Sequence, residues 1–161
     1  AGIYSFGKGL IDRDPIRGSD TSYKRMTPLK VGDLVMSKLN GWEGALAVVD
    51  EPFDGYYVSN EYPVFEVDTE RITTSFLAAL VATPSFWQAL DDATRGSMVR
   101  RRRVHPSGLL KTVIWLPPLA YQDQIGEHLE VLREVGGEER RTELLEAVMP
   151  SLLNATFGEA R

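Results

Sequence analysis

The sequence predicts an α+β fold: a mixed, mostly antiparallel β-sheet domain with packed helices, followed by a helical hairpin or coiled-coil region. Three observations predict it. Short segments rich in β-branched and aromatic residues dominate residues 31–67. Apolar residues recur at helical spacing from residue 73 onward. Helical spacing also fills the stretch after Pro117-Pro118, so we expect a domain over residues 1–118 and a helical region over residues 119–161.

The expected strands lie in the first half of the chain. Residues 1–30 are rich in glycine and charge and show no steady period, so we expect loops around at most a short strand. The next two segments of strand composition should form a hairpin or lie close together, because a Gly-rich connection joins them. The four predicted strands are VGDLVMSKL (31–39), ALAVV (45–49), GYYVSN (55–60) and PVFEV (63–67).

The middle of the chain should contain two helices and one more strand. TTSFLAALVAT (73–83) places its large apolar residues on one helical face. Thr83-Pro84 should start a second helix, because Thr is a good N-cap and Pro suits the first turn. We expect that helix to end at Gly96. LLKTVIWL (109–116) is predicted as a strand that the two following prolines stop.

The last 43 residues, 119–161, should form two amphipathic helices. The first has an apolar stripe that begins at Gln122 and should end at Gly136-Gly137, and the second should be kinked at Pro150. Two such helices predict an antiparallel hairpin or a partner-binding coil. The residues expected to contact a protein partner are Ile125, Leu129, Leu132, Leu145 and Leu152.

Composition narrows the functional classes. The 161 residues suffice for one domain and a small appendage, and the absence of cysteine excludes disulfides and thiolate zinc sites and fits a cytoplasmic protein. The sequence contains no apolar stretch long enough to span a membrane and no visible signal peptide, so we expect no membrane partner. The missing initiator methionine suggests an excised or processed piece. Residues 1–119 hold 14 Lys and Arg against 14 Asp and Glu, whereas residues 120–161 hold 4 against 9. The net charge of −5 therefore comes from the tail, and the body is neutral overall with strong local patches.

The sequence contains no complete motif for catalysis, metal binding or cofactor binding. Gly2, Gly7 and Lys8 fit a phosphate-loop spacing, but Gly9 stands where the hydroxyl ligand of magnesium belongs, so a plain glycine-rich loop is the better interpretation. His105 and His128 lack neighbouring acids at metal-ligand spacing. No Asp/Glu-x-Lys triplet of a magnesium-dependent nuclease occurs. We expect no catalytic residue, no metal and no cofactor.

A run of four arginines is the strongest sign of a binding function. Arg100, Arg101, Arg102 and Arg103 lie with Arg95 in an 18-residue window, 94–111, that contains no acid. Guanidinium groups fit phosphate oxygens and guanine edges bidentately. If the run is extended, alternate side chains face the same way, so one pair can meet DNA while the other contacts the body. The ordinary alternative is a solvated charged face.

Polar residues on the predicted connections are candidate base readers. Amides and hydroxyls on loops above a sheet suit contacts with base edges, and lysines and arginines suit contacts with phosphates. For Trp42 we prefer core packing over base stacking. The loop candidates are Lys38, Asn40, Ser59 and Asn60, followed by Lys24 and Arg25.

Several ordered motifs over residues 4–161 resemble the type I restriction–modification specificity subunits. The first four resemble a target recognition domain of such subunits, and the last is similar to their carboxyl-terminal end. They are GDLVMSKLNGWEGALAVV, GYYVSNEYPVFEVD, TPSFWQAL, GSMVRRRRVHPSGLLKTVIWLPPLAYQDQI and LLEAVMPSLLNATFGEAR.

The resemblance implies a DNA-binding, non-catalytic protein. A full subunit has two recognition domains and two conserved helices, so this chain resembles a half-subunit or the carboxyl-terminal half of a longer one. The implied partners are double-stranded DNA, methyltransferase subunits and through them a restriction subunit. A second copy of the chain is a further candidate partner. S-adenosylmethionine is expected only on the methyltransferase. The alternatives are a module that docks on methyltransferase subunits without binding DNA and, less favoured, an independent enzyme.

Overall fold

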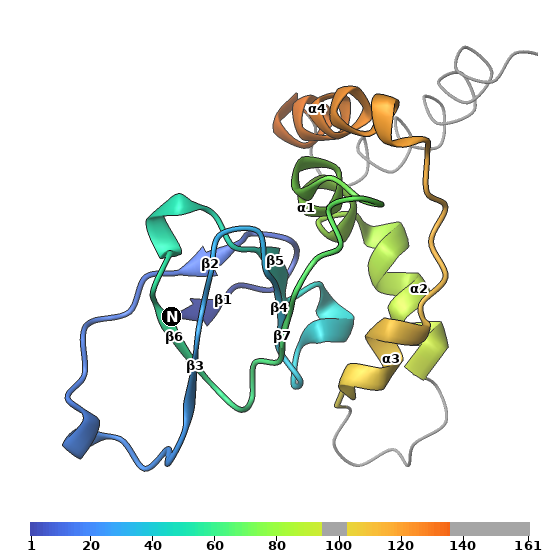
Figure 1. Cartoon of the computed structure of the whole chain (residues 1–161). Coiled ribbons are helices and arrows are strands. Elements are labelled where there is room, and N and C mark those ends of the chain that lie inside the picture. The colour runs from blue at the N-terminus through green and yellow to red at the C-terminus, as the bar shows by residue number, and fades with distance from the viewer. Residues whose placement is uncertain (95–102, 136–161) are drawn as a thin grey trace, which may run out of the picture.

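The computed structural model describes residues 1–94 and 103–135, and within them seven short strands form three small antiparallel sheets (Figure 1). β4 is the central strand of the largest sheet, between β5 and β7, and β1 pairs with β2 and β3 with β6. The strands are β1 (Gly2–Ile3), β2 (Leu10–Ile11), β3 (Met26–Pro28), β4 (Leu34–Met36), β5 (Leu46–Val48), β6 (Tyr57–Ser59) and β7 (Val64–Phe65).

Helices follow the strands in the chain and lie beside them in space (Figure 1). Three short 3-10 helices interrupt the strand region: η1 (Gly18–Asp20), η2 (Gly41–Glu43) and η3 (Glu51–Phe53). The α-helices are α1 (Thr74–Val81), α2 (Pro84–Thr94), α3 (Pro106–Lys111) and α4 (Leu119–Val135). The predicted α+β class is confirmed.

The core has two layers because β4 is buried on both of its faces. Successive side chains of a strand point to opposite faces. Leu34 and Met36 accordingly pack with α1, α2 and α3, whereas Val35 packs with β1, β5 and β6 on the other side. Val35 and Met36 are fully buried. The sheet thus holds the helices on one face and the β1–β2 and β3–β6 pairs on the other.

The predicted restart of the helix at Thr83 is confirmed. The Thr83 hydroxyl oxygen accepts the Phe86 backbone N–H at 3.3 Å, as an N-cap does. The Trp87 ring on the same helix donates its N–H to the Val81 carbonyl at 2.7 Å. These bonds fix the short corner between α1 and α2.

Two predictions about local structure were wrong. Residues 1–30 contain three short strands rather than at most one. The sequence did not indicate them, because strands of two or three residues are too short to leave a periodic pattern. LLKTVIWL is not a strand: its first part belongs to α3, and residues 112–118 have no regular secondary structure and no strand partner. Pro106 at the first turn favours the helix, and Leu109 is buried while Leu110 and Val113 are exposed.

The described part of the predicted C-terminal region is one helix, α4, which packs along α1 (Figure 1). The predicted break at Gly136-Gly137 and the second helix lie outside the described residues. No helix in the described residues is long and apolar enough to cross a membrane.

Candidate nucleic-acid interface

Three connections that are far apart in the sequence meet at one face of the molecule. The Val104 backbone N–H donates to the Lys38 carbonyl at 2.8 Å, and the Lys38 N–H donates to the Glu61 carbonyl at 3.0 Å. The segment before α3, the connection after β4 and the turn between β6 and β7 are therefore tied together by their backbones. Val104 itself is buried in the core and anchors the first of them.

The connection after β4 is shaped by a glycine. Gly44 ends η2 with a φ of 76°, a conformation that favours glycine. A Cβ at this position would lie 2.2 Å from the Trp87 ring, so only a glycine allows α2 to pack this closely against the end of η2. Trp42 packs against the core and donates its ring N–H to the Leu39 carbonyl at 3.0 Å, which confirms the predicted core role. Asn40, just before η2, is exposed, and Lys38 is half-buried.

Charged groups on these connections contact one another. The Arg103 guanidinium donates to the Glu61 carboxylate and forms an ion pair with it, with the two side chains 44% and 31% exposed. The Lys38 ammonium donates to the Asn60 carbonyl. Because the ion pair is accessible to water, it contributes about 0.2–1 kcal/mol and can exchange for another anion. Glu61, which lies directly beside the candidate Asn60, was missed by the sequence reasoning.

The polar candidates differ in exposure. Asn40 and Asn60 are exposed, so their amides are accessible. Ser59 is only 6% exposed, and its hydroxyl accepts the Glu61 backbone N–H at 3.4 Å. Ser59 is therefore mostly covered, and its hydroxyl supports the turn; its predicted contact with DNA stays a prediction.

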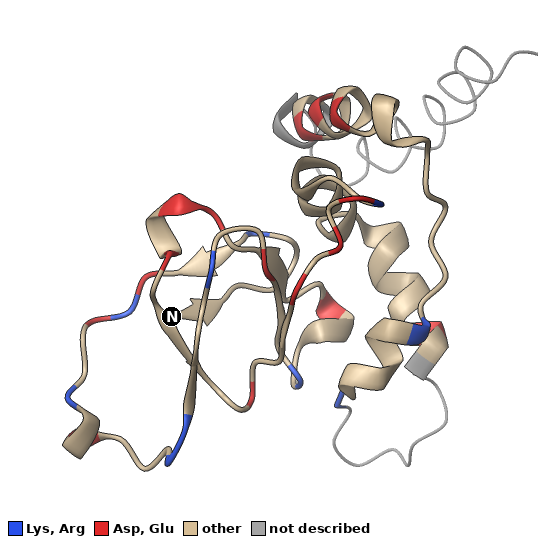
Figure 2. Cartoon of the chain, in the orientation of Figure 1, with Lys and Arg blue, Asp and Glu red and all other residues tan. Residues whose placement is uncertain are grey.

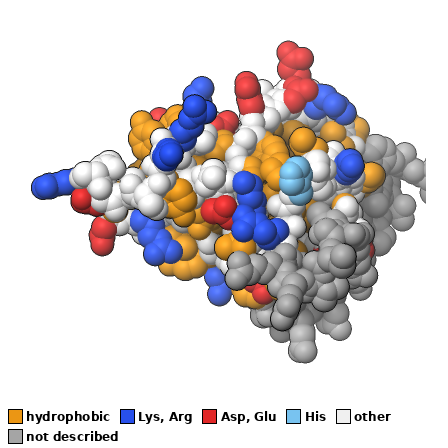
Figure 3. All heavy atoms as spheres, turned by 90° about the horizontal axis from the view of Figure 1, so that it is seen from below, with side chains coloured by type: hydrophobic (Ala, Val, Ile, Leu, Met, Phe, Trp, Pro, Cys, Tyr) orange, Lys and Arg blue, Asp and Glu red, His pale blue; other side chains and the backbone are white. Residues whose placement is uncertain are grey.

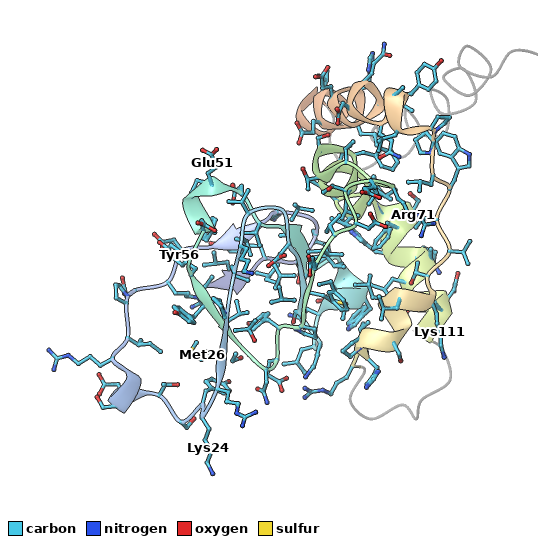
Figure 4. All side chains as sticks on the ribbon, viewed as in Figure 1. Lys24, Met26, Glu51, Tyr56, Arg71 and Lys111 are labelled. Atoms are coloured by element: carbon cyan, nitrogen blue, oxygen red, sulfur yellow. The ribbon has the colours of Figure 1, made fainter. Side chains whose placement is uncertain are left out.

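Lys24 and Arg25 are both exposed and directly precede β3. Met26, the next residue, pairs with Ser59, so the start of β3 lies beside the end of β6. Figure 2 shows the blue segments at the lower ends of these connections, and Figure 4 labels Lys24 there. We call this surface the loop face, and it comprises Lys24, Arg25, Lys38, Asn40, Asn60, Glu61, Arg103 and His105.

The loop face is cationic but not uniformly so. Figure 3 shows the molecule from below, with Lys and Arg side chains spread among apolar surface and a histidine side chain between them. His105 is the N-cap of α3, where its Nδ1 accepts the Ser107 backbone N–H at 3.2 Å. The predicted contacts Arg95, Arg100, Arg101 and Arg102 lie outside the described residues.

The predicted partner-binding stripe is used inside the chain instead. Ile125 and Leu129 are 4% and 8% exposed and pack against Phe76 and Ala79 of α1. Their apolar surface is already covered, so the expectation that they face a protein partner is corrected. The side chain of Leu132, together with Leu145 and Leu152, lies outside the described residues.

A buried amide fixes α4 to the body. Gln122 is fully buried, and its Oε1 accepts the Thr73 backbone N–H at 2.7 Å. Its Nε2 donates to the carbonyls of Arg71 and Pro117, both at 2.9 Å. Every polar atom of the side chain is thus paired, which is what a buried amide requires. The first residue of the predicted apolar stripe, Gln122, is therefore a buried polar side chain that connects α4 to two other segments by hydrogen bonds.

Hydrogen bonds shift two pKa values near these elements. The Ser75 hydroxyl donates to the Asp123 carboxylate at 2.5 Å, and this bond, with a second from Thr73, lowers the pKa of Asp123. The Tyr56 hydroxyl donates to Asp12 at 3.0 Å, and this hydrogen bond to the carboxylate raises the pKa of Tyr56. In the described part of the chain, no group of three or more His, Asp or Glu residues is arranged to hold a metal ion.

Comparisons with known proteins find the same fold in solved structures. The HsdS subunit from Thermoanaerobacter tengcongensis matches 99% of this chain with a TM-score of 0.68 and 22% identity. A chain of a type I restriction–modification system, solved for its complex assembly and conformational transition, matches 87% with a TM-score of 0.61 and 23% identity. This chain spans 43% and 38% of those two chains. No family model and no curated protein matches it. Over nearly its whole length, the chain therefore has the fold of about half of an HsdS subunit.

Proposed function

We propose that this chain binds double-stranded DNA in a sequence-specific manner, as the specificity subunit, or half of it, of a type I restriction–modification complex. The observation that carries the proposal is the convergence of Lys38, Asn60 and Arg103 on one face, from three separate connections. The fold shared with HsdS over 99% of the chain supports it. The motifs quoted above are independent support from the sequence.

The proposed mechanism is binding without chemistry. Lys24, Arg25, Lys38 and Arg103 neutralise phosphates and release counterions, which supplies affinity that does not depend on sequence. The exposed amides of Asn40 and Asn60 contact base edges, where a good bidentate contact discriminates by about 1–3 kcal/mol. The remaining proposed contacts, from the sequence alone, are Arg95, Arg100, Arg101 and Arg102.

Methyl transfer and cleavage are assigned to partner subunits in this proposal. A methyltransferase carries S-adenosylmethionine and methylates adenine at the site that this chain selects, a restriction subunit joins through it, and the complex works in the cytoplasm. Because Ile125 and Leu129 are covered by α1, a partner that docks on α4 contacts its exposed side, where Tyr121 and Val131 lie. The second half of a split DNA site is bound by a second copy or by another domain.

Titration of a labelled duplex at several salt concentrations tests the proposal. We expect affinity to fall steeply with salt, with a logarithmic slope of about −0.9 for each phosphate neutralised. Arg101→Glu with Arg103→Glu should abolish retention of the duplex, while thermal unfolding stays that of the parent. A double variant that unfolds instead assigns the arginines a structural role and contradicts the proposal.

The alternative is a module that docks on methyltransferase subunits without binding DNA. The Arg103–Glu61 ion pair favours it, since an arginine that is paired internally needs no external anion. The two functions separate on the same titration, because a docking module shows no salt-dependent binding. Co-expression with a methyltransferase subunit and mapping of the methylated adenines then identifies the DNA site that the chain selects.

A further inference from the structure

A hollow of about 730 Å³ lies beside the β3–β6 pair, and none of its lining residues belongs to an α-helix. The loop between β2 and β3 forms one wall, and the β3–β6 pair forms the other. Figure 4 labels Met26 and Tyr56, which border the space that this loop encloses. The volume falls within the range of about 300–1,000 Å³ that is typical of small-molecule sites.

The walls of the hollow are unusually rich in tyrosine. Tyr23 comes from the loop, whereas Tyr56, Tyr57 and Tyr62 come from β6 and its flanks. Along β6, Val58 points into the core, and its neighbours Tyr57 and Ser59 line the hollow, as strand alternation requires. Tyr23 and Tyr57 are still 48% and 55% exposed, so large aromatic surface is uncovered there. Such surface marks binding sites more often than it serves stability.

The polar groups of the hollow complement a nucleotide. The Tyr56 hydroxyl holds Asp12 at 3.0 Å and so ties the loop to the strands. The next residues, Arg13 and Asp14, are exposed and line the same space. A guanidinium fits a phosphate bidentately, and a carboxylate accepts from the exocyclic amine of a base. Tyrosine rings stack on any base.

We infer that this hollow binds one unstacked nucleobase together with its phosphate. The nucleotide is either free in solution or an unpaired nucleotide of a duplex held on the loop face. The second source fits the position of the hollow, because Ser59 lines it and the following residues, Asn60 and Glu61, belong to the loop face. This second source rests on the proposed function, whereas the chemistry of the hollow does not.

Two measurements on the full chain test the inference. Ligand-observed NMR with dAMP and dCMP detects binding of free nucleotides, and anisotropy compares a paired duplex with one that carries a single unpaired nucleotide. Tyr23→Ala and Tyr57→Ala should each weaken binding of the nucleotide probe about tenfold, the loss of one base–aromatic stack. The control Tyr4→Ala removes an exposed tyrosine from the connection between β1 and β2, outside the hollow, and should change nothing.

The outcomes separate the hollow from the loop face. Binding of dAMP or dCMP that both hollow variants weaken supports a site for free nucleotides. A preference for the unpaired nucleotide alone, lost in the same variants, supports the duplex as the source. Nucleotide binding without binding to the paired duplex sustains this inference and defeats the proposed function. The inference is overturned if the free nucleotides do not bind and the duplex with an unpaired nucleotide binds no tighter than the paired one. It is also overturned if the binding of either probe is unchanged in both tyrosine variants while they remain folded.

Discussion

Replacing Glu61 by glutamine should tighten binding to DNA of any sequence. The Glu61 carboxylate holds the Arg103 guanidinium. Under the proposed function, a phosphate must displace this carboxylate before Arg103 can contact DNA. Glutamine keeps the size of the side chain and can still accept a hydrogen bond, but it lacks the charge. The substitution therefore frees a cation that is already located on the loop face.

The magnitude follows from the exposure of the pair. Side chains that are 44% and 31% exposed form a screened ion pair, and breaking such a pair costs about 0.2–1 kcal/mol. Glu61→Gln should thus lower the dissociation constant about 1.4- to 5-fold from this source alone, with a further gain from the removed repulsion. The salt slope should steepen by about 0.9 if one more phosphate becomes neutralised.

Fluorescence anisotropy with a random-sequence duplex measures the dissociation constant and its salt slope. The salt concentration should run from 50 to 200 mM, because the affinity of a protein that makes several phosphate contacts falls by orders of magnitude over this range. The matched control is Glu51→Gln, which makes the same charge change on η3, at the end of the molecule away from Lys24 (Figure 4). Combining Glu61→Gln with Arg103→Gln should remove most of the gain. The reasoning is refuted if Glu61→Gln binds no tighter than Glu51→Gln, or if its gain persists without Arg103.

Three further predictions concern stability. Gln122→Ala removes three hydrogen bonds, two part-buried and one buried, each of about 1 kcal/mol, so it should lower the free energy of unfolding by about 3 kcal/mol. Gln124→Ala, on the exposed side of α4, should be nearly neutral, and equal urea midpoints for the two variants would contradict the role given to Gln122. Gly44→Ala should destabilise more than Gly55→Ala, because both glycines have a positive φ but only Gly44 faces the Trp87 ring; thermal unfolding of the two variants isolates that clash. Asp123 has a lowered pKa in the folded chain, so its ionised form stabilises the fold. This contribution to the free energy of unfolding is present above the ordinary value of 3.8 and is lost as the pH falls below it. Asp123→Asn should therefore flatten the loss of stability below about pH 4, and an unchanged acid limb in a pH series of melts would show that the bond to Ser75 is unimportant.

Local signals determined the elements that are long or well capped. The helix over 73–83 and the N-cap at Thr83 follow from side chains within one or two turns, and the structure confirms both. LLKTVIWL failed because its composition suits a strand, yet a strand exists only where a neighbour supplies hydrogen bonds. Residues 112–118 have no such neighbour in the described chain, and Pro106 starts a helix before them.

The sequence by itself determined the α+β class, the kinds of side chain on the connections and the resemblance to specificity subunits. Only the tertiary structure decided that Lys38, Asn60 and Arg103 meet, that Glu61 pairs with Arg103, and that Ser59, Ile125 and Leu129 are covered. The physical reason is range. Periodicity and capping depend on residues a few positions apart, whereas burial and ion pairing depend on which distant segment packs beside them, such as Glu61 and Arg103 across 42 positions.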